Sequence, residues 1–372
     1  MSDDPHANLH SEQGALRGEH PGRARDPVIK AAGLAWLEFE KADLRRTESF
    51  AHDFGFAVSA RTRDALYLRG TLPGPACVVV RRGPASRFVG PVFRAAEAAD
   101  LTRMAEAVGG VVRELGEPGG GRVVELRDPS GVPVRVVHGM EDLPALPEQR
   151  PLTVNAGTEE RRVNAAQRPP REPARVQRLG HVVLETRVFR RALDWYLGTL
   201  GMIVSDFLFL DDQRERGPTM AFLRCDLGGE PADHHTLAMH LGPGVGYVHS
   251  AYQVSDLDAL AAGGEYLAER GHRRVWGVGR HIQGSQIFDY WHDPDRLMLE
   301  HYADGDLFDC AVEPGWAPMS ASGLAQWGPP VTREFLGVNP SPALLRTVVD
   351  ALRGENEIDV ARLAGLMKAM RT

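Results

Sequence analysis

The sequence contains an internal repeat, and this repeat limits the folds that the chain can adopt. Two short apolar segments, Leu34–Glu38 and His181–Glu185, both end in Leu-Glu and both precede a helical pattern. Each half then continues with a strand, a second helical pattern and a closing Asp-Pro turn, at Asp128 and at Asp293. The order of strand, helix and several strands therefore occurs four times. A doubled repeat of this kind predicts an α+β fold of two modules, each built from paired βαβββ units whose strands form a curled, barrel-like sheet around a cavity.

The length of 372 residues is sufficient for two such modules and for additional segments. Residues 1–27 lack periodicity and are rich in glycine, proline and charge, so we expect a mobile tail. The polar stretch 151–175 is typical of a linker between a module over 28–150 and a module over 176–310. Residues 311–372 are expected to form a C-terminal extension with a helical hairpin, which would serve packing or an oligomer surface. We assign this extension no chemistry, and we expect a homo-oligomer.

Composition and charge exclude several classes of protein. The net charge of -7 argues against a nucleic-acid partner. No run approaches the ~18 apolar residues of a membrane span, and the first thirty residues lack the apolar core of a signal peptide, so we expect a cytoplasmic location without a membrane partner. Cys77, Cys225 and Cys310 are widely scattered, as expected for reduced thiols. Any metal site must therefore use histidine and carboxylate ligands.

Three residues of the second module, His181, His249 and Glu300, could ligate a metal. Each lies on a predicted strand among apolar neighbours, where a single polar side chain is more often solvated or hydrogen-bonded than a ligand. A carboxylate that faces a barrel-like interior, however, must find a cation or lose its charge. Two histidines and one carboxylate leave coordination positions open, which is the arrangement used to activate oxygen at non-haem Fe(II).

The first module provides an internal control for these three candidates. Aligning the two Leu-Glu strands, the two following strands and the two Asp-Pro turns places Leu34, Gly90 and Arg135 opposite them. All three candidates are thus absent together from the first module. Residues needed only for packing should have been kept in part in both copies, so their joint presence in one copy favours a site.

A second group of polar residues accompanies the candidate ligands. His234 and His235 form a pair near a predicted turn, where surface exposure is the common alternative, and His281 follows a Gly-Arg dipeptide. A simple antiparallel hairpin centred on the second Asp-Pro turn places Tyr290 opposite Glu300. A phenol would then lie beside the metal.

The spacing of these residues forms a recognisable pattern. A glycine precedes His181, a His-x-x-Ala motif begins at His235 and is followed by His249 after 14 residues, and steps of 9 and 10 residues join His281 to Tyr290 and Glu300. This pattern resembles the type I extradiol ring-cleavage dioxygenases of the vicinal oxygen chelate superfamily, such as catechol 2,3-dioxygenase and 2,3-dihydroxybiphenyl 1,2-dioxygenase. The resemblance covers roughly residues 28–310 and is weaker in the first half. The chain departs from the family in having one histidine, not a pair, on the second ligand strand, and in a longer C-terminal tail.

The resemblance implies both a reaction and roles for these residues. The chain is expected to open the ring of a catechol beside the diol with O2 at a non-haem Fe(II), giving a product of the 2-hydroxymuconic semialdehyde type. The three candidate ligands would hold the metal, and the first module would be degenerate and metal-free. His235 would be the acid–base catalyst, with His234 as the alternative. His281 and Tyr290 would hydrogen-bond the bound substrate.

Other functions stay open at the level of sequence. Another metal enzyme on the same scaffold, similar to 4-hydroxyphenylpyruvate dioxygenase or to glyoxalase, could share the His, His, Glu set. A non-catalytic binding or resistance protein of the superfamily would not need the ligands. Mn(II) could replace Fe(II), because histidine and carboxylate ligation does not exclude it. The ring substituent of the catechol does not follow from the sequence.

Overall fold

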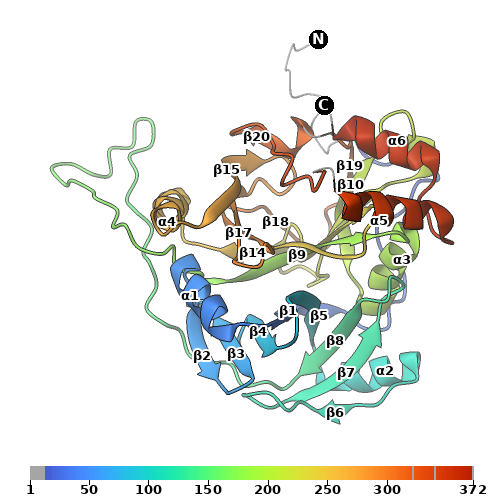
Figure 1. Cartoon of the computed structure of the whole chain (residues 1–372), viewed down its shortest axis with the longest axis horizontal. Helices are drawn as coiled ribbons and strands as arrows, with labels where there is room; N and C mark the ends of the chain where they lie inside the picture. Colours follow the sequence, from blue (N-terminus) through green and yellow to red (C-terminus); the bar gives the residue numbers. More distant parts are fainter. Residues whose placement is uncertain (1–12, 321, 339–340, 371–372) are drawn as a thin grey trace.

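The computed structural model describes residues 13–320, 322–338 and 341–370 and contains two mixed sheets (Figure 1). The first sheet has eight strands in the order β2-β3-β4-β1-β5-β8-β7-β6. Its strands are β1 (Ala31–Lys41), β2 (Ala57–Arg61), β3 (Ala65–Arg69), β4 (Val78–Arg82), β5 (Arg87–Ala95), β6 (Arg113–Glu114), β7 (Arg122–Arg127) and β8 (Pro133–His138). Helices α1 (Leu44–Phe54) and α2 (Ala98–Val108) belong to this module.

The second sheet has ten strands in the order β19-β10-β11-β13-β9-β14-β17-β16-β15-β20. Its strands are β9 (Arg178–Thr186), β10 (Ile203–Phe209), β11 (Met220–Arg224), β13 (Leu237–Leu241), β14 (Gly246–Gln253), β15 (Arg273–His281), β16 (Ile287–His292), β17 (Met298–Ala303), β19 (Gly315–Pro318) and β20 (Ala325–Trp327). A separate pair consists of β12 (Ala232–Asp233) and β18 (Leu307–Phe308), and the helices are α3 (Phe189–Leu200) and α4 (Leu257–Glu269). Short 3-10 turns cover Arg214–Arg216 and Ser322–Leu324.

The two sheets repeat one pattern of strand pairing. In the first, β1 is parallel to β4 and antiparallel to β5, and β5 is parallel to β8. In the second, β9 is parallel to β13 and antiparallel to β14, and β14 is parallel to β17. The predicted α+β fold of two modules with curled sheets is therefore confirmed. Both sheets are open, since each has two edge strands.

The modules pack through a shared hydrophobic core. Phe54 at the end of α1 is fully buried and stacks on His301 of β17 with ring centroids 3.8 Å apart. The His301 Nε2–H donates to the Phe54 carbonyl oxygen at 2.7 Å. Tyr196 of α3 belongs to the second module and contacts the first, where its hydroxyl donates to the Asp128 carboxylate at 3.2 Å. Each module thus contacts the closing turn or strand of the other.

Residues 13–27, which belong to the predicted mobile tail, lie against the second module. The Gly22 carbonyl oxygen accepts a hydrogen bond from the Val204 backbone at 2.8 Å, and Glu19 forms an ion pair with Arg214 at 2.8 Å. A Cβ on Gly22 would lie only 2.5 Å from the Pro314 ring. Composition did not reveal these contacts, because they are made by the backbone and by a distant arginine. Residues 1–12 of the predicted tail lie outside the described residues.

The second sheet also extends beyond residue 310, where the sequence placed the end of the module. Strand β19 pairs in parallel with β10, and β20 pairs with the end of β15. Strands of three or four residues carry too little periodicity to be recognised from sequence. Helices α5 (Pro342–Arg353) and α6 (Val360–Ala369) follow and lie near α3 in Figure 1. None of the helices in the described ranges is long and apolar enough to cross a membrane.

Candidate metal centre

Three neighbouring strands of the second sheet bring His181, His249 and Glu300 together. In the strand register, Ala251 of β14 is the partner of both His181 on β9 and Glu300 on β17, and His249 lies two residues earlier on the same face. His181 Nε2 and His249 Nε2 are each 3.4 Å from Glu300 Oε2. The three ligand atoms lie within 4.8 Å of one another. His181 and Glu300, which are more than a hundred positions apart in the sequence, thus form one cluster with His249.

The chemistry of this cluster fits a divalent metal ion. Glu300 is fully buried, and both its carboxylate oxygens lack a hydrogen-bond partner among the residues that the structure describes. Burial lowers the pKa of His249 to about 4, so its imidazole is neutral near pH 7 and offers a lone pair. Burial alone would raise the pKa of Glu300, but the two imidazoles hold it below its usual range. Ligands about 2.1 Å from a metal and roughly 90–110° apart lie about 3.0–3.4 Å from each other, and each histidine Nε2 lies 3.4 Å from Glu300 Oε2.

His281 and Tyr290 lie on the next two strands and face the cluster. The Tyr290 hydroxyl is 2.8 Å from His281 Nε2, and His281 Nδ1 is 2.8 Å from the Leu324 carbonyl oxygen. Because a carbonyl only accepts, Nδ1 carries the proton, and Nε2 accepts from the phenol. Tyr290 is the register partner of Glu300, as the hairpin pattern predicts. Burial and then the Glu300 charge raise the pKa of Tyr290, which keeps the phenol protonated.

His234 and His235 are buried, so the surface alternative for this pair is wrong. The His235 ring lies beside that of His181, with centroids 3.9 Å apart. His235 Nδ1 is 3.0 Å from His234 Nδ1, and His234 Nε2 is 2.7 Å from the Asp206 carboxylate. The Asp206 carboxylate accepts from His234 Nε2–H, and in the tautomer in which His234 Nδ1 accepts from His235 Nδ1–H, His235 Nε2 is left without a proton. His235 is then a base, and Asp206 orients the chain of rings behind it.

Sequence reasoning missed Asp206 and the C-terminal cover of the site. Asp206 is the one acid in the apolar run of β10, and that position was a signal that could have been used. The Phe335 ring centroid lies 4.8 Å from that of Tyr290 and 6.2 Å from that of His249. Beside it, Glu334 forms ion pairs with Arg273 and Arg296, and its carboxylate lies 2.9 Å from His292 Nε2. The segment after residue 310 therefore contributes directly to the site, in contrast to the expectation that it carries no chemistry.

The first module has other side chains at the corresponding places. The register pairs Val92 with both Trp36 and Arg135, as it pairs Ala251 with His181 and Glu300, so Trp36 and not Leu34 is the counterpart of His181. The alignment of the Leu-Glu endings was wrong by two residues, a shift that keeps the face of the strand and therefore escapes pattern analysis. Arg135 forms an ion pair with Glu38. A Cβ on Gly90 would lie 2.0 Å from the Pro133 carbonyl oxygen, so this backbone has no room for a histidine there.

The chain resembles known proteins in its fold and, over part of its length, in its sequence. No protein-family model matches the chain. The chain is 34% identical over 161 residues to metapyrocatechase 2 of Cupriavidus necator, a match that covers 43% of this chain and about half, 47%, of that relative. Homoprotocatechuate 2,3-dioxygenase from Brevibacterium fuscum, solved with 3,4-dihydroxyphenylacetate, superposes with a TM-score of 0.68 at 20% identity over 86% of this chain and 95% of that one. Over part of its length the chain is similar in sequence to metapyrocatechase 2, and it has the fold of the extradiol dioxygenases.

Other solved structures show how widely this extradiol dioxygenase fold is used. The dioxygenase LapB from Pseudomonas sp. KL28 has a TM-score of 0.62 at 16% identity, covering 78% of this chain and 98% of that one. A Mn(II)-bound glyoxalase from Novosphingobium aromaticivorans has a TM-score of 0.68 at 21% identity, covering 84% of this chain and 95% of that one. Because the same fold serves a dioxygenase and a glyoxalase, the reaction must be argued from the site.

Proposed function

We propose that this protein is an extradiol ring-cleavage dioxygenase that opens a catechol with O2 at a ferrous ion held by His181, His249 and Glu300. The observation that carries the proposal is the buried cluster of these three side chains, with a histidine base on one side and a His–Tyr pair on the other. The relative named metapyrocatechase supports it. A cytoplasmic location and a homo-oligomeric state remain predictions from the sequence.

Bound at these ligands, a ferrous ion would supply open coordination positions where a diol and O2 can meet, and Lewis-acid assistance to deprotonation of the diol. The protein itself would move the proton. His235 Nε2 takes a hydroxyl proton from the catechol, and the positive charge that develops is stabilised through His234 by the Asp206 carboxylate. Burial lowers the pKa of His235, so the ring returns its proton readily when the product forms.

The remaining residues would orient the substrate and exclude water. The Tyr290 oxygen, whose proton is donated to His281, can accept a hydrogen bond from a bound hydroxyl group. The Leu324 carbonyl fixes the orientation of the His281 ring. Phe335 covers Tyr290 and His249 from the C-terminal segment. The polar groups of the site therefore operate in a dry environment, which strengthens their electrostatic interactions.

A panel of catechols tests this function. Protein reconstituted with Fe(II) under anaerobic conditions is mixed with aerated catechols that carry alkyl, aryl or carboxylate substituents. We expect a yellow ring-opened product and consumption of one O2 per catechol, with cleavage beside the diol. Full iron occupancy without ring opening of any catechol would refute the proposal.

A glyoxalase-type reaction is the second candidate, because the Mn(II)-bound glyoxalase matches the fold as well as the dioxygenase does. Such a reaction moves a proton within a hemithioacetal and consumes no oxygen. Two assays separate the candidates: the catechol panel above, and an assay in which the protein is loaded with Mn(II) and offered a methylglyoxal–glutathione hemithioacetal without O2. Turnover there, together with inactivity toward catechols in air, would favour the glyoxalase.

A further inference from the structure

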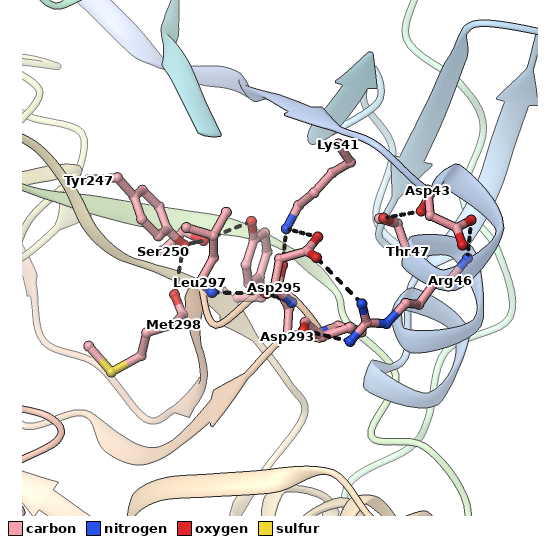
Figure 2. Close-up of polar contacts among 12 residues, drawn as sticks. Lys41, Asp43, Arg46, Thr47, Tyr247, Ser250, Asp293, Asp295, Leu297 and Met298 are labelled. Atoms are coloured by element: carbon pink, nitrogen blue, oxygen red, sulfur yellow. Dashed lines mark hydrogen bonds and ion pairs between the residues drawn. The ribbon is translucent and has the colours of Figure 1, made fainter. Parts of the chain in front are cut away.

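Lys41 of the first module is buried against the turn that precedes Glu300 in the second. Its side chain is 3% exposed, and its Nζ forms ion pairs with Asp293 and, at 3.0 Å, with Asp295. Figure 2 shows Lys41 at the end of β1 reaching this turn, with Arg46 of α1 beside it. Arg46 donates to the Pro294 carbonyl oxygen at 2.7 Å and lies 3.7 Å from Asp295. Two cations of the first module thus hold one short turn of the second.

This turn fixes the start of the strand that carries Glu300. The Asp293 carboxylate accepts from the backbone N–H of Asp295 at 2.8 Å and of Leu297 at 2.9 Å. One residue further, the Met298 carbonyl oxygen accepts from the Tyr247 hydroxyl at 2.7 Å. Met298 is the register partner of His249. The same short stretch of backbone therefore connects the Lys41 contact to the strands of two candidate ligands.

The corresponding turn of the first module is held differently. Asp128 accepts from the backbone of Ser130 and Val132 at 2.8 and 2.9 Å, in the same pattern as Asp293. Its contact from the other module is the neutral Tyr196 hydroxyl. Burying a cation costs free energy unless the cation is paired, and the turn of the first module shows that the contact between modules can be made without one. The charged contact is found at the turn that leads to Glu300, whereas the turn that leads to Arg135 has a neutral one.

We propose that Lys41 is a positioning residue, through which the first module holds the 293–296 turn and so sets the placement of Glu300 and Tyr290 relative to His181 and His249. This inference rests on the proposed metal site. It gives the first module a role in metal binding although its own counterpart positions carry no ligands. Loss of the Lys41 charge leaves the buried Asp293 carboxylate uncompensated, and the turn must then rearrange to reach water.

The test compares Mn(II) binding by the full-length variants Lys41→Met, Lys41→Arg and Lys30→Met, measured by the electron paramagnetic resonance of free Mn(II). Lys30 is the matched control, because it also forms a Lys–Asp ion pair across the modules, with Asp226 at 2.5 Å, but does not touch the turn. We expect Lys41→Met to weaken Mn(II) binding about 10-fold, the size of effect typical of groups that orient ligands. Lys41→Arg should restore most of this loss, and Lys30→Met should bind as the wild type does.

Thermal unfolding of the metal-free variants separates positioning from simple stabilisation. A lowered melting temperature with unchanged Mn(II) affinity of the folded Lys41→Met protein would overturn the proposal, as would a wild type that binds no Mn(II). If Lys41→Met does not fold, Asp295→Asn removes one of its two carboxylate partners and should weaken Mn(II) binding about threefold, while wild-type affinity in that variant would overturn the inference. No catechol is used, so these results judge Lys41 even if ring cleavage is not observed.

Discussion

Glu300 is buried among histidine side chains, and no lysine or arginine of the described residues pairs with its carboxylate. His181 and His249 approach it through Nε2, and their Nδ1 atoms make no hydrogen bond to any described residue. Because burial lowers the pKa of His249 to about 4, its imidazole does not balance a carboxylate in the way that an arginine would. In the first module, Arg135 occupies the position that corresponds to Glu300. Because Arg135 forms an ion pair with Glu38, the charges there are balanced without a metal ion.

Glu300→Gln should therefore abolish tight metal binding while preserving the shape of the side chain. We expect Fe(II) and Mn(II) affinity to fall by at least about 100-fold, since removing a ligand costs more than removing a group that orients one. Metal content after reconstitution and Mn(II) titration measure this. Glu125→Gln, on an exposed face of the first module, is the control. A variant that retains wild-type metal content would remove Glu300 from the site.

His235→Asn should separate proton transfer from metal binding. The ring lies beside His181 but is not one of the three clustered ligands, so metal content should stay at the wild-type level. Loss of a positioned base should lower kcat by about 10²–10⁴-fold. His240→Asn is the control. The His240 Nδ1 lies 3.3 Å from the Leu241 carbonyl oxygen, so this substitution should change kcat little. Equal kcat in wild type and His235→Asn would show that another group accepts the proton.

Among the elements, those with strong periodicity were predictable and those defined by distant contacts were not. Helices α5 and α6 lie in the extension where a helical hairpin was expected, and the repeat of strand and helix matches β1–α1 and β9–α3. The short strands β19 and β20 were missed because each is recognisable only by the strand that it pairs with. The candidate ligands could be named because three polar residues disappear together from the other copy. Asp206 and Phe335 were missed. The sequence marks Asp206 as the one acid of an apolar run, but its role, like that of Phe335, depends on which rings the fold places beside it.

Phe335 lies in the segment between β20 and α5, and truncating its side chain tests whether this segment covers the site. Phe335→Ala should open the site to water and lower kcat/KM for catechols about 10-fold, with metal content unchanged, because Phe335 packs on Tyr290 and Trp276. Steady-state kinetics and the rate at which bound Fe(II) oxidises in air measure the two consequences, and oxidation should become faster. Leu345→Ala, at an exposed position of α5, is the control. Unchanged kinetics and oxidation would mean that Phe335 does not seal the site.

At the level of the whole molecule, the two modules should unfold together. Phe54 is fully buried at their interface and stacks on the residue that follows Glu300. Phe54→Ala should lower the free energy of unfolding by about 3–5 kcal/mol, the usual cost of deleting a buried phenylalanine side chain. Denaturant titration should still give one cooperative transition. Val111→Ala, at an exposed position, should change the free energy by less than about 0.5 kcal/mol. Two resolved transitions would contradict a shared core.

Because Lys41 is buried between the modules, the chemical reactivity of its amine shows whether the modules are packed together. The chain has three lysines, and the other two, Lys30 and Lys368, are about half exposed. An amine-reactive label would therefore mark two lysines in the native protein and the third only after the modules separate. Counting labels by mass spectrometry would follow the opening of the interface without any engineered probe.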